Sequence, residues 1–208
     1  METTPRVPQA PAAPLPALDE FLRPFHAHFA RSEGREALER YLTGLLTEQP
    51  VKNCNTIPQV VPRTSEQRLQ GLLTNMVWDH DDLNDQRVRQ MLTLPTEGDG
   101  VLIFDDTGFA KQGNCSVGVK RQYSGTLGRT GNCQVTVNCH YAERTLAWPV
   151  STRLYLPKKE WALDPERRKK AKVPEEVTFQ TKPEIALALL DQARELGVPH
   201  CCITADAE

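Results

Sequence analysis

Two short apolar runs in the sequence are each followed at once by acidic side chains. The run 101–104 leads into Asp105 and Asp106, and the run that begins near Cys201 leads into Asp206. Like charges at the end of a buried strand add little to fold stability, so we expect a ligand or a reaction to use at least one of them. Two close carboxylates repel each other unless a cation bridges them, and Mg²⁺ prefers such oxygen ligands. The predicted chemistry is metal-assisted phosphoryl transfer, in which one ion activates water or a hydroxyl and another stabilises the leaving oxygen.

The elements expected around these acids form a mixed sheet in an α/β fold. Residues 101–104 predict a short buried strand, and the two strands that follow have short connections and should pair antiparallel. An amphipathic helix over 182–197 has a proline in its first turn and a glycine at its end. A right-handed crossover through this helix would return the last strand beside the first, so that Asp106 and Asp206 face one another. The expected strands span 101–104, 133–142, 145–156 and 200–206.

The first half of the chain has the periodicity of helices. Residues 18–47 predict one broken and one regular helix, and Ser65 is placed to cap a helix whose apolar face runs from Leu69 to Val77. Another helix is expected over 83–94. The acids just before it lack the glycine and terminal glutamate of a calcium loop, which favours a helix cap with an acidic face. The predicted domains are a disordered Pro-rich tail (1–17), a helical region (18–97) and a sheet domain (98–208).

Composition and charge exclude several classes of protein. The chain has 208 residues, 39% of them hydrophobic, which can support a globular core. It has neither the roughly 18 consecutive apolar residues of a membrane span nor a secretory signal, so we expect a cytoplasmic protein with no membrane partner. Six cysteines without C-x-x-C spacing favour buried free thiols over a zinc site. The net charge is −2, but residues 158–172 carry seven basic and three acidic side chains, within a basic insertion around 157–180.

Several ordered motifs resemble the DDE-type transposases of bacterial insertion sequences. They are VLIFDDTGFAKQG (101–113), SVGVKRQYSGTLGRTGNCQV (116–135), LYLPKKEW with DPERRKKAKVPEEVTFQTKPE (154–184), and ITADAE (203–208). The segments RYLTGLL and LLTNMVWDHDDLNDQRVRQML are similar to the helical region that precedes the catalytic core in these proteins. The resemblance implies a DNA-binding helical region over 18–97 and a partial ribonuclease-H-like core over 98–208.

The resemblance also implies an activity and its partners. Such an enzyme is a DDE endonuclease that cuts the ends of an insertion sequence and joins them to target DNA by two-metal phosphoryl transfer. The implied cofactor is Mg²⁺, with Mn²⁺ as a substitute. The implied partners are DNA, both as element ends and as target, and a second copy of the protein in a synaptic complex.

The catalytic acids of such enzymes can be carried onto this sequence. The first acid falls in the adjacent pair, and Asp106 is preferred over Asp105 because an acid followed by threonine fits the family pattern better; strand alternation leaves the choice open. The second acid falls on Asp206, so Asp106 and Asp206 are the expected metal ligands. The third is a glutamate far downstream on a helix, and Glu208 is too close to Asp206 to stand in for it. We therefore expect the chain alone to lack its third acid and to be inactive by itself.

Basic and aromatic side chains near these acids are expected to contact DNA. A group of Lys and Arg residues beside the acidic strand ends can neutralise phosphates, and Tyr123 and Trp161 can stack on exposed bases. The expected DNA-binding residues are Lys120, Arg121, Tyr123, Arg129, Lys158, Lys159, Arg167, Arg168, Lys169 and Lys170.

Two other interpretations stay open. A truncated or repurposed transposase remnant would bind DNA or a partner without cutting it, and would show no metal-dependent nicking. An aspartyl-phosphate phosphatase would use Asp105 as a nucleophile and form an acyl phosphate. Its motif fits poorly, because it places the second acid two positions after the first and continues into parallel crossover units.

Overall fold

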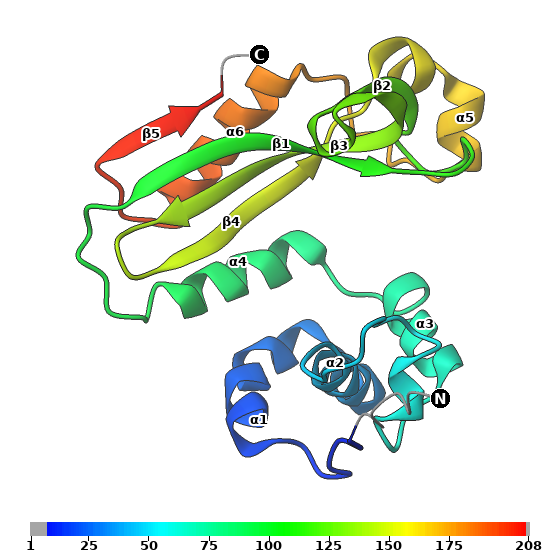
Figure 1. The fold of residues 1–208 in the computed structure, drawn as a ribbon, viewed down its shortest axis with the longest axis vertical. Helices are drawn as coiled ribbons and strands as arrows, with labels where there is room; N and C mark the ends of the chain where they lie inside the picture. Colours follow the sequence, from blue (N-terminus) through cyan, green and yellow to red (C-terminus); the bar gives the residue numbers. More distant parts are fainter. Residues whose placement is uncertain (1–7, 207–208) are drawn as a thin grey trace, which may run out of the picture. The chain divides into compact units, whose positions relative to one another are not determined.

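The computed structural model describes residues 8–206, and the chain divides into two compact units, Met1–Arg87 and Val88–Glu208 (Figure 1). The first seven residues of the predicted Pro-rich tail lie outside the described residues, as does Glu208. In the described part of that tail, the Ala10 N–H donates to the Val60 carbonyl at 2.8 Å. This stretch of the tail is therefore hydrogen-bonded to the first unit.

The first unit is helical. Ile57 and Leu69 lie in one of its buried clusters, and Phe29 and Leu72 lie in another. Ile57 packs directly against the backbone of a helix at Gly44, where an added Cβ would lie 2.3 Å from Ile57 Cγ2. The elements are α1 (Pro16–Leu22), the 3₁₀ helix η1 (Arg23–His28), α2 (Ser32–Leu45), the 3₁₀ helix η2 (Ile57–Gln59), α3 (Glu66–Thr74) and the first part of α4 (His80–Met91).

Side-chain caps explain where two of these helices begin. Ser65 Oγ accepts the Arg68 N–H at 3.3 Å and caps α3, as predicted. Asp79 Oδ1 accepts the N–H groups of Asp81 at 2.9 Å and Asp82 at 3.1 Å. These hydrogen bonds stabilise the charged carboxylate and lower the pKa of Asp79. The prediction that the acidic cluster caps a helix is confirmed.

The second unit contains a mixed five-stranded sheet in the order β2-β3-β1-β5, with β4 pairing to another part of β3. The β1–β5 pair is parallel and the other pairs are antiparallel. The predicted α/β class, with a mixed sheet and a return of the last strand to the first, is confirmed. The strands are β1 (Val101–Ala110), β2 (Lys120–Ser124), β3 (Arg129–Ala142), β4 (Ala147–Leu154) and β5 (Cys202–Ala205).

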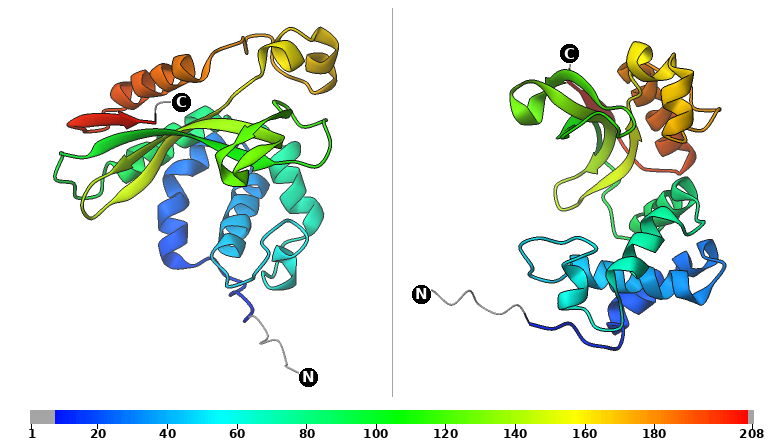
Figure 2. Two further views of the ribbon diagram at one scale, coloured as in Figure 1. Left: turned by 45° about the horizontal axis from the view of Figure 1, so that its top comes forward. Right: turned by 90° about the vertical axis from the view of Figure 1, so that its right-hand side faces the viewer.

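Helix α6 (Lys182–Glu195) provides the crossover to β5 and packs on one face of the sheet (Figure 2). Leu189 of this helix lies in the same core as Leu102 and Phe104 of β1. Cys139 of β3 is fully buried there, and burial raises the pKa of its thiol to about 12. The helix thus covers the face of the sheet on which the even-numbered residues of β1 lie.

Strand β1 is longer than the sequence predicted. The expected strand ended at Phe104, whereas the observed one continues to Ala110, because β3 offers backbone partners as far as Cys133 opposite Ala110. Asp105 and Asp106 therefore lie within the strand and not at its tip. Successive side chains in a strand point to opposite faces, so these two carboxylates are directed apart.

The basic stretch folds into a small module, which we call the basic module (157–173), and shares a buried cluster with Val119 and Leu156. It contains a π-helical turn, η4 (Lys158–Ala162), and the short helix α5 (Pro165–Lys170). Trp161 is completely buried, and its Nε1–H donates to the Val119 carbonyl at 2.8 Å. The expectation that Trp161 stacks on bases is therefore wrong, because the ring fills the core of this module.

The cysteines divide by exposure. Cys133 and Cys139 are buried free thiols, as predicted, whereas Cys115, Cys201 and Cys202 are exposed. The apolar run around the last pair suggested burial, but β5 is the edge strand of the sheet and its residues are all exposed. Within the described residues, no helix has the length and apolar character needed to cross a membrane.

Candidate active site

The parallel pairing of β1 with β5 brings the two acidic segments together. The register pairs Val101 with Cys202 and continues to Phe104 opposite Ala205. Asp206 directly follows the last residue of β5, just as Asp105 and Asp106 follow Phe104 on β1. The acidic pair of β1 and Asp206 therefore lie at the same end of the β1–β5 pair. Their carboxylate oxygens do not form a group of three within 4.8 Å among the described residues.

The two adjacent acids of β1 occupy different surroundings. Asp106 is on the face covered by α6, together with the buried Leu102 and Phe104, and it is partly buried. Asp105 is exposed on the opposite face, where its Oδ1 accepts the Asp106 N–H at 2.7 Å. Strand alternation in the sequence could not show which of the two acids faces a helix. In the structure, α6 covers the face that carries Asp106 and leaves Asp105 exposed.

Lys182, the first residue of α6, forms an ion pair with Asp106 through Nζ and Oδ2. Both side chains remain partly exposed, 40% for the lysine and 27% for the aspartate. Cys133 is near enough to respond to both charges. Burial is the main reason that the pKa of its thiol is raised, Asp106 raises it further, and Lys182 acts in the opposite direction. Lys182 was not among the site residues predicted from the sequence, and it lies 76 residues from its partner.

A buried asparagine holds the polar part of β1 from the other side. Asn138 of β3 donates from Nδ2 to Thr107 Oγ1 at 2.9 Å and to the Asp105 carbonyl at 3.4 Å. Its Oδ1 accepts hydrogen bonds from Thr136 at 3.1 Å and Thr152 at 3.0 Å. These bonds fix the backbone of the acidic pair across three strands. The alternating pattern of β3 gave no sign of this role, since Asn138 falls on its polar positions.

The end of β2 lies directly over β1 at Gly108, two residues beyond Asp106 and on the same face. Ser124 is buried at this contact, and its Oγ has no hydrogen-bond partner among the described residues. A Cβ at Gly108 would lie 2.2 Å from Ser124 Oγ and 2.8 Å from Ser124 Cβ. The absence of a side chain at Gly108 therefore allows β2 and the turn η3 (Gly125–Leu127) to close over the strand that carries the acids.

Replacing Gly108 with alanine is expected to destabilise the second unit by about 1–3 kcal/mol, the usual cost of overpacking a close contact. The added methyl group would push Ser124 and η3 away from β1. Chemical denaturation should show the loss, and adding Ser124→Gly should recover most of it because this change removes the two nearest obstructing atoms. A G108A variant as stable as the wild type would contradict the close packing described at this position.

The donors at this place suit a hard divalent cation. The side chains of Asp105, Asp106 and Asp206 offer carboxylate oxygens, which Mg²⁺ and Mn²⁺ prefer. Asp106 Oδ2 already binds a positive charge, the Lys182 ammonium, which is consistent with cation binding at this oxygen. A second acidic group, in which ligand atoms of Asp79, His80 and Asp81 lie within 4.8 Å of one another, belongs to the capped start of α4.

Several of the basic residues expected to contact DNA make contacts within the basic module. Arg167 stacks on the Trp161 ring at 3.8 Å and donates to the carbonyls of Glu160 at 2.8 Å and Asn114 at 2.6 Å. Arg168 donates to the Pro174 carbonyl at 2.8 Å. These two arginines therefore hold the module together and attach it to the neighbouring segments.

Two of the expected lysines also have partners. Lys120 pairs with Glu160 at 3.1 Å, and this contact lowers the pKa of the Glu160 carboxyl. Lys158 Nζ lies 5.1 Å from the centre of the Phe179 ring. The exposed members of the predicted set lie on β2, at the start of β3 and on the basic module, all toward the end of the sheet to which β1 runs (Figure 1). They are Arg121, Tyr123, Arg129, Lys158, Lys159, Lys169 and Lys170.

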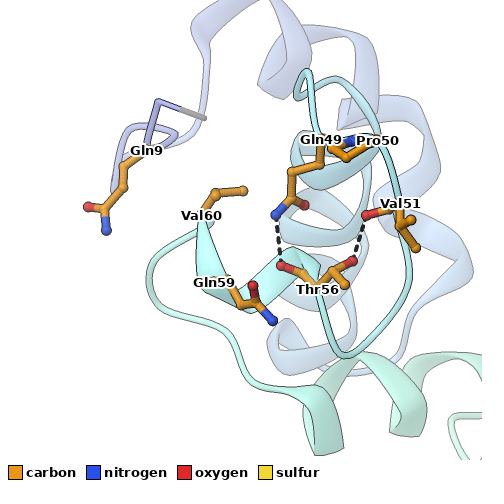
Figure 3. Close-up of a pocket in the computed structure, with 7 residues that line it drawn as sticks. All are labelled: Gln9, Gln49, Pro50, Val51, Thr56, Gln59 and Val60. Carbon is orange, nitrogen blue, oxygen red and sulfur yellow. Dashed lines mark hydrogen bonds between the residues drawn. The ribbon is translucent and has the colours of Figure 1, made fainter. Parts of the chain in front are cut away.

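A hollow of about 350 Å³ in the first unit has a different character (Figure 3). Its polar groups largely bond to one another, since Gln49 Nε2 donates to the Thr56 carbonyl at 3.0 Å and Thr56 Oγ1 donates to the Val51 carbonyl at 2.7 Å. The lining has no acidic or basic side chain and offers nothing for phosphate or metal chemistry. It is lined by Gln9, Gln49, Pro50, Val51, Thr56, Gln59 and Val60.

Comparison with known proteins identifies the family. The sequence model of the DDE superfamily endonuclease family matches residues 24–208, which is most of the chain. The chain belongs to this family. The chain is also 28% identical over 198 residues to a protein of Microchaete diplosiphon, which is described as a probable transposase for insertion sequence element IS701. This match covers 95% of the chain and 49% of the relative, so the chain spans about half the length of that protein. No solved structure matches the chain.

Proposed function

We propose that this DDE-family chain takes part in DNA strand cleavage and strand transfer by divalent-metal-dependent phosphoryl transfer. Asp106 and Asp206 are the proposed metal ligands, and Asp105 is a further candidate. The observation that supports this proposal best is the parallel pairing of β1 with β5 after the α6 crossover, because the acids from distant parts of the chain directly follow the paired residues Phe104 and Ala205. The ion pair with Lys182 favours Asp106 over Asp105 as the first metal ligand, because it shows that the Asp106 carboxylate is accessible to a cation on the α6 face.

Each part of the site has a proposed task. Divalent ions bound there would activate the attacking water or hydroxyl and stabilise the leaving oxygen of the phosphodiester. Asp106 and Asp206 would hold them, while Asn138 and the pairing with β3 keep the backbone of β1 in place. The β2 end, resting on Gly108, would shield one side of the carboxylates from solvent.

DNA is the proposed substrate, both as element ends and as target. The exposed Arg121, Arg129 and Lys159 would contact phosphates, as would Lys169 and Lys170. Arg167 and Arg168 belong to the same proposed surface but also support the module. Exposed Tyr123 would stack on a base. A third acid, and a second protein copy in a synaptic complex, are part of the proposal for the whole enzyme.

The activity is tested by following the nicking of supercoiled DNA with Mg²⁺ or Mn²⁺ present. The assay uses the 208-residue chain and, in parallel, the complete translated product of its locus. We expect metal-dependent nicking by a product that supplies all three acids, and its loss in D106N and D206N with DNA binding retained. Metal-independent DNA binding without nicking in every preparation would instead support a remnant that binds without cutting. Normal cleavage by both variants would refute the assignment of the acids.

The phosphatase interpretation receives no support. β1 pairs antiparallel with β3, whereas an aspartyl-phosphate enzyme is expected to continue from this strand into parallel crossover units. Treatment with beryllium fluoride provides a direct check, because a phosphatase would bind this acyl-phosphate analogue at Asp105 and the proposed nuclease would not.

A further inference from the structure

Lys182 has an unusual position for a cation. It is the first residue of α6, where the N–H groups and the helix dipole produce a positive potential that disfavours another positive charge. The neighbouring Glu184 does not neutralise it in this arrangement, because the Glu184 carboxylate accepts the Thr181 N–H at 2.7 Å and its hydroxyl at 2.8 Å in a capping box. The ammonium reaches across to Asp106 instead.

We propose that Lys182 is a built-in counter-ion of Asp106 that competes with the divalent metal for this carboxylate. The inference rests on the proposed function, since it concerns the same site. In the absence of metal, the ammonium offsets the negative charge of Asp106 on the α6 face. Occupation of the site by a divalent ion requires the ammonium to leave Asp106 Oδ2 or to share it.

The competition follows from distance and charge. A metal ion lies about 2.1 Å from a carboxylate oxygen, and an ammonium lies about 2.8 Å from it, so both on one carboxylate would place like charges within a few ångströms. The lysine stem is attached to a helix whose start is fixed by its capping box, so the charge stays near the site even after it moves. Lys182 is thus a positioning residue that lowers the affinity for metal while preserving the metal-free site.

The test is direct measurement of Mn²⁺ binding to the 208-residue chain, with free Mn²⁺ quantified by electron paramagnetic resonance. Lys182→Met keeps the apolar stem and removes the charge, and we expect it to bind Mn²⁺ about two- to fivefold more tightly, the size of effect typical of a partly exposed ion pair. Lys182→Arg keeps the charge and should bind like the wild type. Because ligand binding stabilises the folded state by mass action, Mn²⁺ should also raise the thermal midpoint more in K182M than in the wild type.

Two kinds of failure can be told apart. If the wild type binds Mn²⁺ and D106N binds it poorly, while K182M binds no more tightly than the wild type, the proposed site stands and the competition by Lys182 is refuted. If wild type and D106N bind equally, or neither binds at all, then the proposed metal site and the role of Lys182 are both refuted. Tighter binding in K182R as well as K182M would show that charge is not the cause, and would also overturn the inference.

Discussion

Replacing Asp106 with asparagine is expected to weaken Mn²⁺ binding to the chain at least about 100-fold. Loss of a residue that only orients a ligand already costs 10–100-fold in metal affinity, and Asp106 is proposed to be a ligand itself. Asparagine has nearly the same size, so the fold should persist while the negative charge is lost. Isothermal titration calorimetry with Mn²⁺ at fixed ionic strength measures the effect.

Two matched variants make this result specific. Asp105→Asn changes the adjacent acid, which is exposed on the other face of β1, and its effect should be clearly smaller than that of D106N. Asp191→Asn removes an exposed acid from α6 and should leave binding unchanged. If D105N lost binding and D106N retained it, the first ligand would be Asp105. Equal binding by D106N and D191N would contradict the site.

Replacing Trp161 with alanine is expected to reduce the free energy of unfolding of the second unit by about 3–5 kcal/mol, the usual cost of truncating a buried tryptophan. The ring is completely buried, bonds to the Val119 carbonyl and supports the Arg167 guanidinium. Its loss should loosen the basic module and, with it, the exposed Lys169 and Lys170. Denaturant titration followed by circular dichroism measures the stability.

The same variant tests whether the basic module contributes to DNA binding. W161A should bind a DNA duplex more weakly than the wild type in fluorescence anisotropy, with a smaller dependence on salt because fewer phosphates are contacted. Leu163→Ala is the matched control, since this neighbouring side chain is 65% exposed and its loss should change neither stability nor binding. If W161A is destabilised but binds DNA with an unchanged salt dependence, the basic module does not contribute to DNA binding.

The sequence predicted those features of the fold that are encoded locally. The apolar run before Asp105, the proline in the first turn of α6 and the apolar run before Asp206 were enough to predict a crossover that pairs the first and last strands. Ser65 was recognised as a cap because its partner, the Arg68 N–H, lies in the first turn of the same helix. Periodicity and capping act over a few residues, so one sequence can reveal them.

The features that were missed depend on contacts between distant segments. β1 extends beyond Phe104 because β3 pairs with it, and Trp161 is buried because Val119 and Leu156 surround it. The pairing of Lys182 with Asp106 arises only when α6 lies on the sheet. These partners cannot be read from local sequence patterns. The only local signal was Lys182 itself, because a lysine at the start of a helix is electrostatically unfavourable.

The central claim is that Asp106 and Asp206 hold the same metal ion, and a double-mutant cycle on Mn²⁺ affinity tests it most directly. D106N, D206N and the double variant would be compared with the wild type by electron paramagnetic resonance. If the two carboxylates share one ion, each single variant should lose most of the binding and the double variant should lose little more, because residues that act as a unit are not additive. Full binding by either single variant, or independent and additive losses, would contradict the claim.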